Sequence, residues 1–205
     1  DLFSMQSPNR RIERSNSNIN FLNTNYSLKN DLTEYEAKNF FLEGTGSLVL
    51  DRVNKNAYMA ESNRSNVSLA SKWSQLRGYD LVHFKSYIDK KPTYHTNVLM
   101  FITNKFAGIC FDSISDSKNL LSNIEKTHKI LNLSTEQVKN FSGNAIVVRN
   151  INNEAKFLIS TSGLKAFDLI QKRFIEKYYD IVDINIPTIE KIGGGSVRCM
   201  VLELF

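Results

Sequence analysis

A pattern of two apolar segments joined by a polar turn occurs three times in this chain. Each copy is typical of a β-hairpin, and the copies occupy residues 46–60, 96–111 and 143–160. Each begins with a small polar pair, and the second residues of these pairs, with the matching residue before the last apolar segment, are Ser47, Asn97, Asn144 and Ser196. Because these positions follow one another at intervals of about 50 residues, the chain is predicted to contain repeated supersecondary units.

Between the hairpins lie segments whose apolar residues recur at helical spacing. They cover residues 65–79, 116–131 and 161–179. Short strands are predicted after them at residues 80–85, 138–141 and 179–186, and a terminal apolar strand is predicted within residues 192–205. The predicted α/β unit is therefore hairpin, helix and strand, repeated about three times, with a partial unit at each end. Such modules bury their apolar faces against their neighbours, and closed rings of them exist.

In a closed ring, the starts of the first strands converge on a common axis although they lie far apart in the sequence. The residues near these starts that carry chemistry are Glu43, His95, Asn144 and Cys199. A thiol, an imidazole and a carboxylate in one cleft form a nucleophilic site, in which the cysteine attacks, the histidine handles protons and the glutamate orients the histidine.

Each of these residues also has a purely structural interpretation. A cysteine in an apolar strand, such as Cys199, is often a small core residue, and Glu43, which precedes a glycine, also suits a turn cap. His95 follows a polar loop and precedes a hairpin, which favours a cleft over a core. Core packing is the preferred interpretation for Cys110, His83 and His128.

The composition excludes membrane and secreted classes. The chain is 41% hydrophobic and 23% charged, which is ordinary for a globular protein. No apolar run approaches the roughly 20 residues of a membrane span, and the first residues lack the layout of a secretory signal. We therefore expect a cytoplasmic protein with no membrane partner, in which Cys110 and Cys199 are free thiols.

The charge distribution argues against a nucleic-acid-binding protein, and the spacing of the cysteines and histidines argues against a metalloprotein. The net charge is +5, but the one dense basic run, residues 10–14, is typical of a solvated face, so no nucleic-acid partner is expected. The two cysteines and three histidines are dispersed along the chain, so neither a metal nor a cofactor is predicted. The oligomeric state is left open, and a homo-oligomer is compatible with the sequence.

Three stretches carry a resemblance to a known family. They are FLEGTGSLVLDR at residues 41–52, PTYHTNVLMFITNKFAGICFDSI at 92–114 and IPTIEKIGGGSVRCMVLELF at 186–205. In this order they resemble the guanidine-modifying (pentein) superfamily of arginine deiminases, dimethylarginine hydrolases and amidinotransferases. The strongest likeness is to the citrulline utilization hydrolase branch, and it extends from about Ser7 to the end of the chain.

The resemblance implies a five-unit α/β propeller with a Cys, His, Glu site at its centre. Cys199 matches the nucleophile, His95 the general acid/base and Glu43 its carboxylate partner. Arg64 falls where relatives bind the substrate's α-carboxylate, although a surface arginine at a helix start is an equal alternative. Asn97 stands where many members have an aspartate that grips the guanidinium.

The resemblance also implies that residues 1–205 are a single catalytic domain covering roughly the C-terminal two-thirds of the family's ring. An acidic, asparagine-rich motif of the relatives would precede Asp1. Gly193, Gly194 and Gly195 then let the backbone pass close to a flat substrate, with a permissive loop as the alternative.

The predicted function is that of a cysteine-dependent hydrolase. Its small-molecule substrate would carry a guanidino or ureido group, as arginine and citrulline do, and its C–N bond would break through a covalent S-alkyl intermediate. Two alternatives stay open at this point. One is an amidinotransferase, in which an amine replaces water, and the other is a non-catalytic binding module or fragment.

Overall fold

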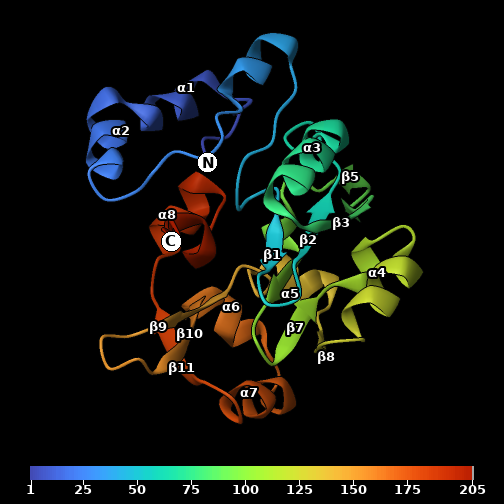
Figure 1. Ribbon diagram of the computed structural model, residues 1–205. Helices are drawn as coiled ribbons and strands as arrows, with labels where there is room; N and C mark the ends of the chain where they lie inside the picture. Colours follow the sequence, from blue (N-terminus) through green and yellow to red (C-terminus); the bar gives the residue numbers. More distant parts are fainter. Residues whose placement is uncertain (205) are drawn as a thin grey trace.

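The computed structural model describes residues 1–204, and within them three sheets share one topology (Figure 1). The first contains β1 (Val49–Asp51), β2 (Asn56–Ala60) and β3 (Asp80–Phe84). The second contains β6 (Met100–Ile102), β7 (Phe106–Ile109) and β8 (Lys129–Asn132). The third contains β9 (Ile146–Arg149), β10 (Ala155–Ser160) and β11 (Asp180–Ile184). A separate short hairpin consists of β4 (Tyr87–Ile88) and β5 (Lys91–Pro92).

Each sheet is built in the same way, which confirms the repeated unit expected from the spacing. The first two strands form an antiparallel hairpin, and the third runs parallel to the second. A parallel pair needs a crossover, and helices supply it. The crossover helices are α3 (Val67–Arg77) in the first unit, α4 (Ser117–Ile124) in the second, and α6 (Thr161–Ala166) with α7 (Leu169–Glu176) in the third.

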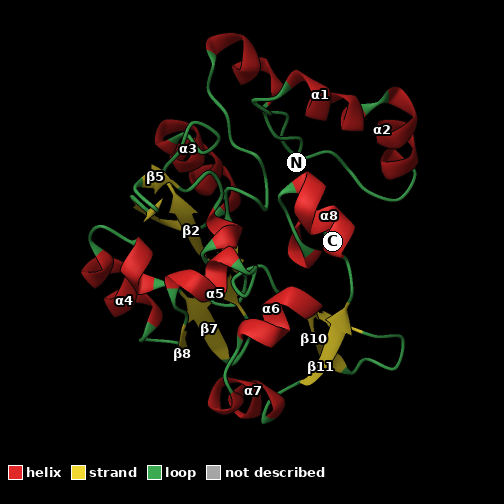
Figure 2. Ribbon diagram, turned by 180° about the vertical axis from the view of Figure 1, so that it is seen from behind, coloured by secondary structure: helices red, strands yellow, loops and turns green. Residues whose placement is uncertain are grey.

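The remaining helices flank these units. At the N-terminal side they are α1 (Pro8–Arg11), η1 (Ile12–Arg14), α2 (Asn16–Asn23) and η2 (Thr33–Lys38). Later in the chain come η3 (Thr96–Val98), η4 (Phe111–Ser113), α5 (Thr135–Lys139), α8 (Pro187–Gly193) and η5 (Val197–Met200). Figures 1 and 2 both show α1 and α2 at one end of the molecule and α7 at the other, with α8 beside the N-terminus. In the described residues no helix has the length and apolar character needed to cross a membrane.

Local sequence signals explain the boundaries of α3. The side chain of Asn66 accepts the backbone N–H of Leu69, which caps the first turn. The helix ends at Gly78, which has a φ of 67°, a left-handed conformation that glycine adopts without strain. Trp73 and Leu69 are buried on the inner face of this helix. The predicted helix and its glycine stop are confirmed.

Two predicted strands are helical instead. Residues 138–141 belong to α5 and the turn after it, because Ser134 and Gln137 form a reciprocal capping box that starts a helix. The strand of this unit is β8, so the predicted helix over 116–131 ends at Ile124 and becomes extended before Leu131. Residues 197–200 form the 3₁₀ helix η5 rather than a strand, and no strand pairs with residues 201–204 of the described chain.

The predicted helix over 161–179 is interrupted. Phe167 is extended and Asp168 caps a new helix through a capping box with Gln171, so α6 and α7 are separate. His83 is also not a core residue. In β3 the side chains alternate, and Val82 and Phe84 are buried while His83 faces solvent and lies 2.7 Å from Glu61.

Neighbouring units share their cores. One cluster joins Tyr58 and Phe84 of the first sheet to Met100 and Ile109 of the second. Another joins the second sheet to the third, with Phe101 and Phe106 against Phe157 at ring-centroid distances of 5.2 and 6.3 Å. Each unit therefore buries its apolar face on the next one, as expected for repeated modules.

The shared aromatic core generates a stability prediction. Phe157 is fully buried, so Phe157→Ala is expected to lower the free energy of unfolding by about 3–5 kcal/mol, measured by urea denaturation. Phe21→Ala is the matched control, since Phe21 is exposed, and it should change the value by less than about 0.5 kcal/mol. Equal effects of the two changes would contradict the packing described above.

Candidate active site

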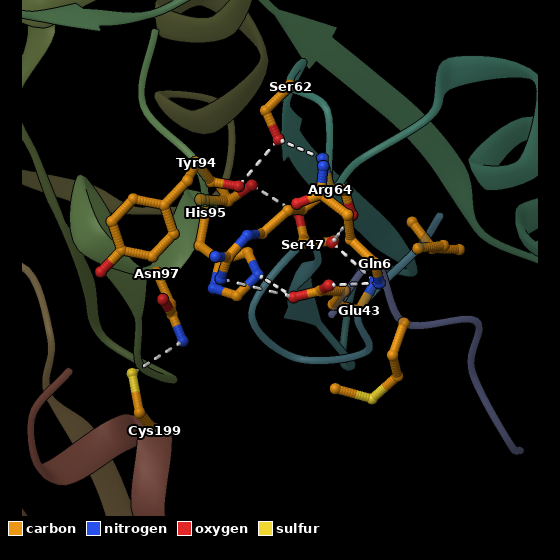
Figure 3. Close-up of polar contacts among 12 residues, drawn as sticks. Gln6, Glu43, Ser47, Ser62, Arg64, Tyr94, His95, Asn97 and Cys199 are labelled. Carbon is orange, nitrogen blue, oxygen red and sulfur yellow. Dashed lines mark hydrogen bonds and ion pairs between the residues drawn. The ribbon is translucent and has the colours of Figure 1, made fainter. Parts of the chain in front are cut away.

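A buried carboxylate and an imidazole form the centre of the site. Glu43 lies in the turn before β1, and its Oε2 is 2.8 Å from Nε2 of His95 (Figure 3). Its Oε1 accepts the backbone N–H of Gln6 at 2.8 Å. Because a carboxylate only accepts hydrogen bonds, Nε2 of His95 carries the proton in this contact. Nδ1 of the ring is then the nitrogen available for proton exchange.

Arg64 completes the surroundings of this carboxylate. Its Nη1 is 3.8 Å from Glu43 Oε2, and its guanidinium lies 5.3 Å from the ring centroid of Tyr94. Burial alone raises the pKa of Glu43, but hydrogen bonds from His95 and Gln6 and the charges of His95 and Arg64 outweigh burial. The pKa of Glu43 is therefore held below its ordinary value of 4.5, and the side chain is ionised at neutral pH.

The position of His95 requires a glycine at residue 46. A Cβ atom at Gly46 would come within 2.8 Å of the imidazole, which is closer than carbon atoms pack. The Tyr94 ring lies on the imidazole with a centroid distance of 5.0 Å. Gly46 and Tyr94 therefore confine the ring while Glu43 sets its tautomer.

The two cysteines have opposite environments. Both are free, which confirms the prediction of free thiols; Cys110 is buried and Cys199 is exposed. Cys199 lies in η5, and its Sγ is 3.2 Å from Nδ2 of Asn144 and 3.6 Å from Nδ2 of Asn97. Since Asn97 is in η3, two residues after His95, the structure brings the predicted thiol, imidazole and carboxylate into one neighbourhood.

Hydrogen bonds connect the starts of successive units. Asn97 N–H donates to Gly46 O, Nδ2 of Asn144 donates to Asn97 O, and the N–H of Arg198 donates to Oδ1 of Asn144. The four repeat positions Ser47, Asn97, Asn144 and Ser196 are all buried. These bonds link the starts of successive units to one another.

Two residues that the sequence analysis did not single out hold the loop before Cys199. Tyr94 donates its hydroxyl to Gly194 O at 2.6 Å. Glu190, in α8, is buried and accepts hydrogen bonds from Ser162 and Ser196, each at 2.7 Å. A carboxylate one turn before a glycine-rich loop is a weak signal in sequence, and one of its partners, Ser162, lies 28 residues earlier in the chain.

A cleft adjoins this group of residues. It has a volume of about 610 Å³ and lies between the start of α3 and the β4–β5 hairpin. Ser62, Arg64, Lys85, Tyr87 and Tyr94 are among the residues that line it. Within the described residues, no three His, Cys, Asp or Glu side chains are grouped closely enough to hold a metal ion.

A comparison with known protein families identifies the family of this chain. All of residues 1–205 match the family described as N,N-dimethylarginine dimethylhydrolase, eukaryotic. The chain belongs to this family. The dimethylarginine dimethylhydrolases are guanidine-modifying enzymes of the pentein superfamily, so the superfamily named from the sequence is confirmed. A search of curated proteins found no match. The citrulline utilization hydrolase branch stays a prediction.

Several solved structures are similar to this chain and share its mixed α/β fold. The product-bound N-terminal domain of the arginine dihydrolase ArgZ of cyanobacteria has a TM-score of 0.73 at 14% identity, over 98% of this chain and 68% of that one. Full-length apo ArgZ has a TM-score of 0.72 at 13% identity, over 97% of this chain, which spans only 29% of that protein. A mutant of the Pseudomonas aeruginosa dimethylarginine dimethylhydrolase in complex with citrulline has a TM-score of 0.62 at 16% identity, over 96% of this chain and 67% of that one.

The depressed pKa of Glu43 generates a pH prediction. A carboxyl whose folded-state pKa is lowered contributes stability above its unfolded pKa and loses it as pH falls through the folded pKa. Glu43→Gln replaces an acceptor oxygen by an NH₂ group that faces the N–H donors of His95 and Gln6. This change should lower the free energy of unfolding by about 1–3 kcal/mol at pH 7. The difference in free energy of unfolding between wild type and variant should shrink below pH 4.5. Urea denaturation from pH 7 to pH 3 measures it, and a constant difference would contradict the assignment.

Proposed function

We propose that the protein is a cysteine-dependent hydrolase of a guanidino or ureido C–N bond in an arginine-like or citrulline-like amino acid. The observation that carries the proposal is the exposed thiol of Cys199 against Asn97, which lies two residues after the His95 of the His95–Glu43 pair. Similar folds include an arginine dihydrolase and a dimethylarginine dimethylhydrolase that binds citrulline. The three consecutive units with shared cores also support a propeller arrangement.

The chemistry follows from the groups present. The Cys199 thiolate attacks the sp² carbon of the substrate, and a C–S bond forms. His95 protonates the departing nitrogen, so that the C–N bond breaks and a covalent S-alkyl intermediate remains. His95, now deprotonated, takes a proton from water as the water oxygen attacks the same carbon, and the C–S bond breaks to release product and thiolate. Glu43 keeps the imidazole oriented through both steps.

Asn97 and Arg64 are proposed to bind the substrate. Oδ1 of Asn97 is buried and has no hydrogen-bond partner among the described residues, which costs about 1–3 kcal/mol unless an N–H group of a ligand reaches it. Guanidino and ureido groups offer such donors. Arg64 borders the cleft and is 3.8 Å from its carboxylate partner, a long contact that leaves it able to bind a substrate carboxylate.

The assignment of the nucleophile is tested by labelling. A haloacetamidine reagent should modify Cys199 and spare Cys110, because only Cys199 is exposed. Cys199→Ser should abolish turnover of arginine-like and citrulline-like substrates, whereas Cys110→Ser is the matched control and should keep it. Peptide mass spectrometry locates the label. Equal modification of both thiols, or full activity in Cys199→Ser, would remove Cys199 from the mechanism.

Substrate charge is predicted from Asn97. A buried guanidinium needs carboxylates, but Glu43 is already paired with His95 and Arg64. A neutral ureido group can pair with an amide without leaving a buried charge. We expect a higher kcat/KM for citrulline than for arginine, and Asn97→Asp should shift the ratio toward arginine by about tenfold or more. A wild-type preference for arginine, or an unchanged ratio in the variant, argues against this role.

A further inference from the structure

Asn144 makes three side-chain hydrogen bonds, one of them to the candidate nucleophile. It begins the third unit and is 2% exposed. Its Oδ1 accepts the N–H of Arg198 at 3.0 Å. Its Nδ2 donates to Asn97 O at 2.9 Å and to Cys199 Sγ at 3.2 Å. One side chain therefore connects the second unit, the third unit and the turn that carries the thiol.

The orientation of this amide is fixed by its neighbours. The backbone N–H of Arg198 can only donate, so the atom that faces it is the oxygen of Asn144. The carbonyl of Asn97 can only accept, so the atom that faces it is the amide nitrogen. Both contacts agree, and the group directed at the sulfur is a hydrogen-bond donor.

We infer that Asn144 is a further catalytic residue, which stabilises the ionised sulfur of Cys199 by donating a hydrogen bond to it; this inference rests on the proposed function. A donor that bonds the charged form of an acid favours that form. Hydrogen bonds to ionised acceptors are also about twice as strong as neutral ones. Nδ2 of Asn97, at 3.6 Å, supplies a second and longer contact to the sulfur. The neutral amides thus favour the attacking species without introducing a charge.

The charged and titratable groups near Cys199 Sγ are bound to other partners, so they do not supply the hydrogen bond that Asn144 donates. Arg198 follows the same turn, and its guanidinium is bound to Glu203 at 2.6 Å and to Val201 O. Tyr94 keeps its proton, because burial and the nearby Cys199 raise its pKa. His95 and Glu43 bond each other. None of these groups contacts Asn144 through its side chain, so substitutions of Asn144 test the amide itself.

The test is the pH dependence of Cys199 alkylation, which needs no substrate. Iodoacetamide is the probe, and peptide mass spectrometry separates Cys199 from Cys110. Asn144→Asp keeps an acceptor for the Arg198 N–H but replaces the donor at the sulfur by an anion. We expect alkylation at pH 7 to slow about tenfold or more, with the half-maximal rate reached about one pH unit higher. Asn140→Asp, which adds the same charge at an exposed position, should match wild type.

Other outcomes separate the inference from the proposed function. An Asn144→Asp profile equal to that of Asn140→Asp overturns the inference, even where Cys199→Ser has abolished turnover. Turnover retained in Cys199→Ser instead overturns the function, whatever the alkylation profile. If thermal unfolding shows that Asn144→Asp is not folded, Asn144→Ala is used, and an unchanged profile in it is equally negative.

Discussion

The carboxylate of Glu43 is buried, and a buried negative charge is stable only when donors surround it. Three parts of the chain supply them: the backbone at Gln6, the ring of His95 and the guanidinium of Arg64. Each of these belongs to a different stretch of sequence, so the site assembles only when the N-terminal segment, the end of the first hairpin and the start of the second unit meet. The buried charge of Glu43 is therefore stable only where the backbone of Gln6 and the side chains of His95 and Arg64 lie around it.

A second constraint acts along the line of unit starts. Backbone and side-chain bonds run from Gly46 through Asn97 and Asn144 to Arg198 and so link successive units to the turn that carries Cys199. The turn that carries Cys199 has no sheet ladder of its own. It is held by Asn144 of the third unit and by Glu190 of the neighbouring helix α8, and the contact with Asn144 makes the position of the thiol depend on how the units pack.

The repeat could be predicted from the sequence because hairpins carry a strong period and the polar residue at each start recurs at a regular interval. The residues of the His95–Glu43 pair and of Cys199 followed from that regularity. Residues 138–141 and 197–200 could not be predicted correctly, since a few apolar residues fit a strand or a short helix equally well. At residues 138–141 the capping box of Ser134 and Gln137 decides for the helix. The role of Asn144 depends on hydrogen bonds between distant units, and that of Glu190 on a bond from Ser162 as well as one from nearby Ser196. No local sequence pattern records the long-range contacts.

The bond from Gln6 to Glu43 has a consequence for how this segment can evolve. The donated hydrogen belongs to the main chain, so every residue type except proline offers it equally. The same holds for Met5, whose backbone N–H binds Glu36. These two contacts therefore do not depend on which side chains stand at the two positions. Substitutions among relatives would therefore show that Glu43 is constrained but would not reveal its bond with the backbone N–H of residue 6. Replacing the residues of this segment by proline, one at a time, is the mutagenesis that tests the bond.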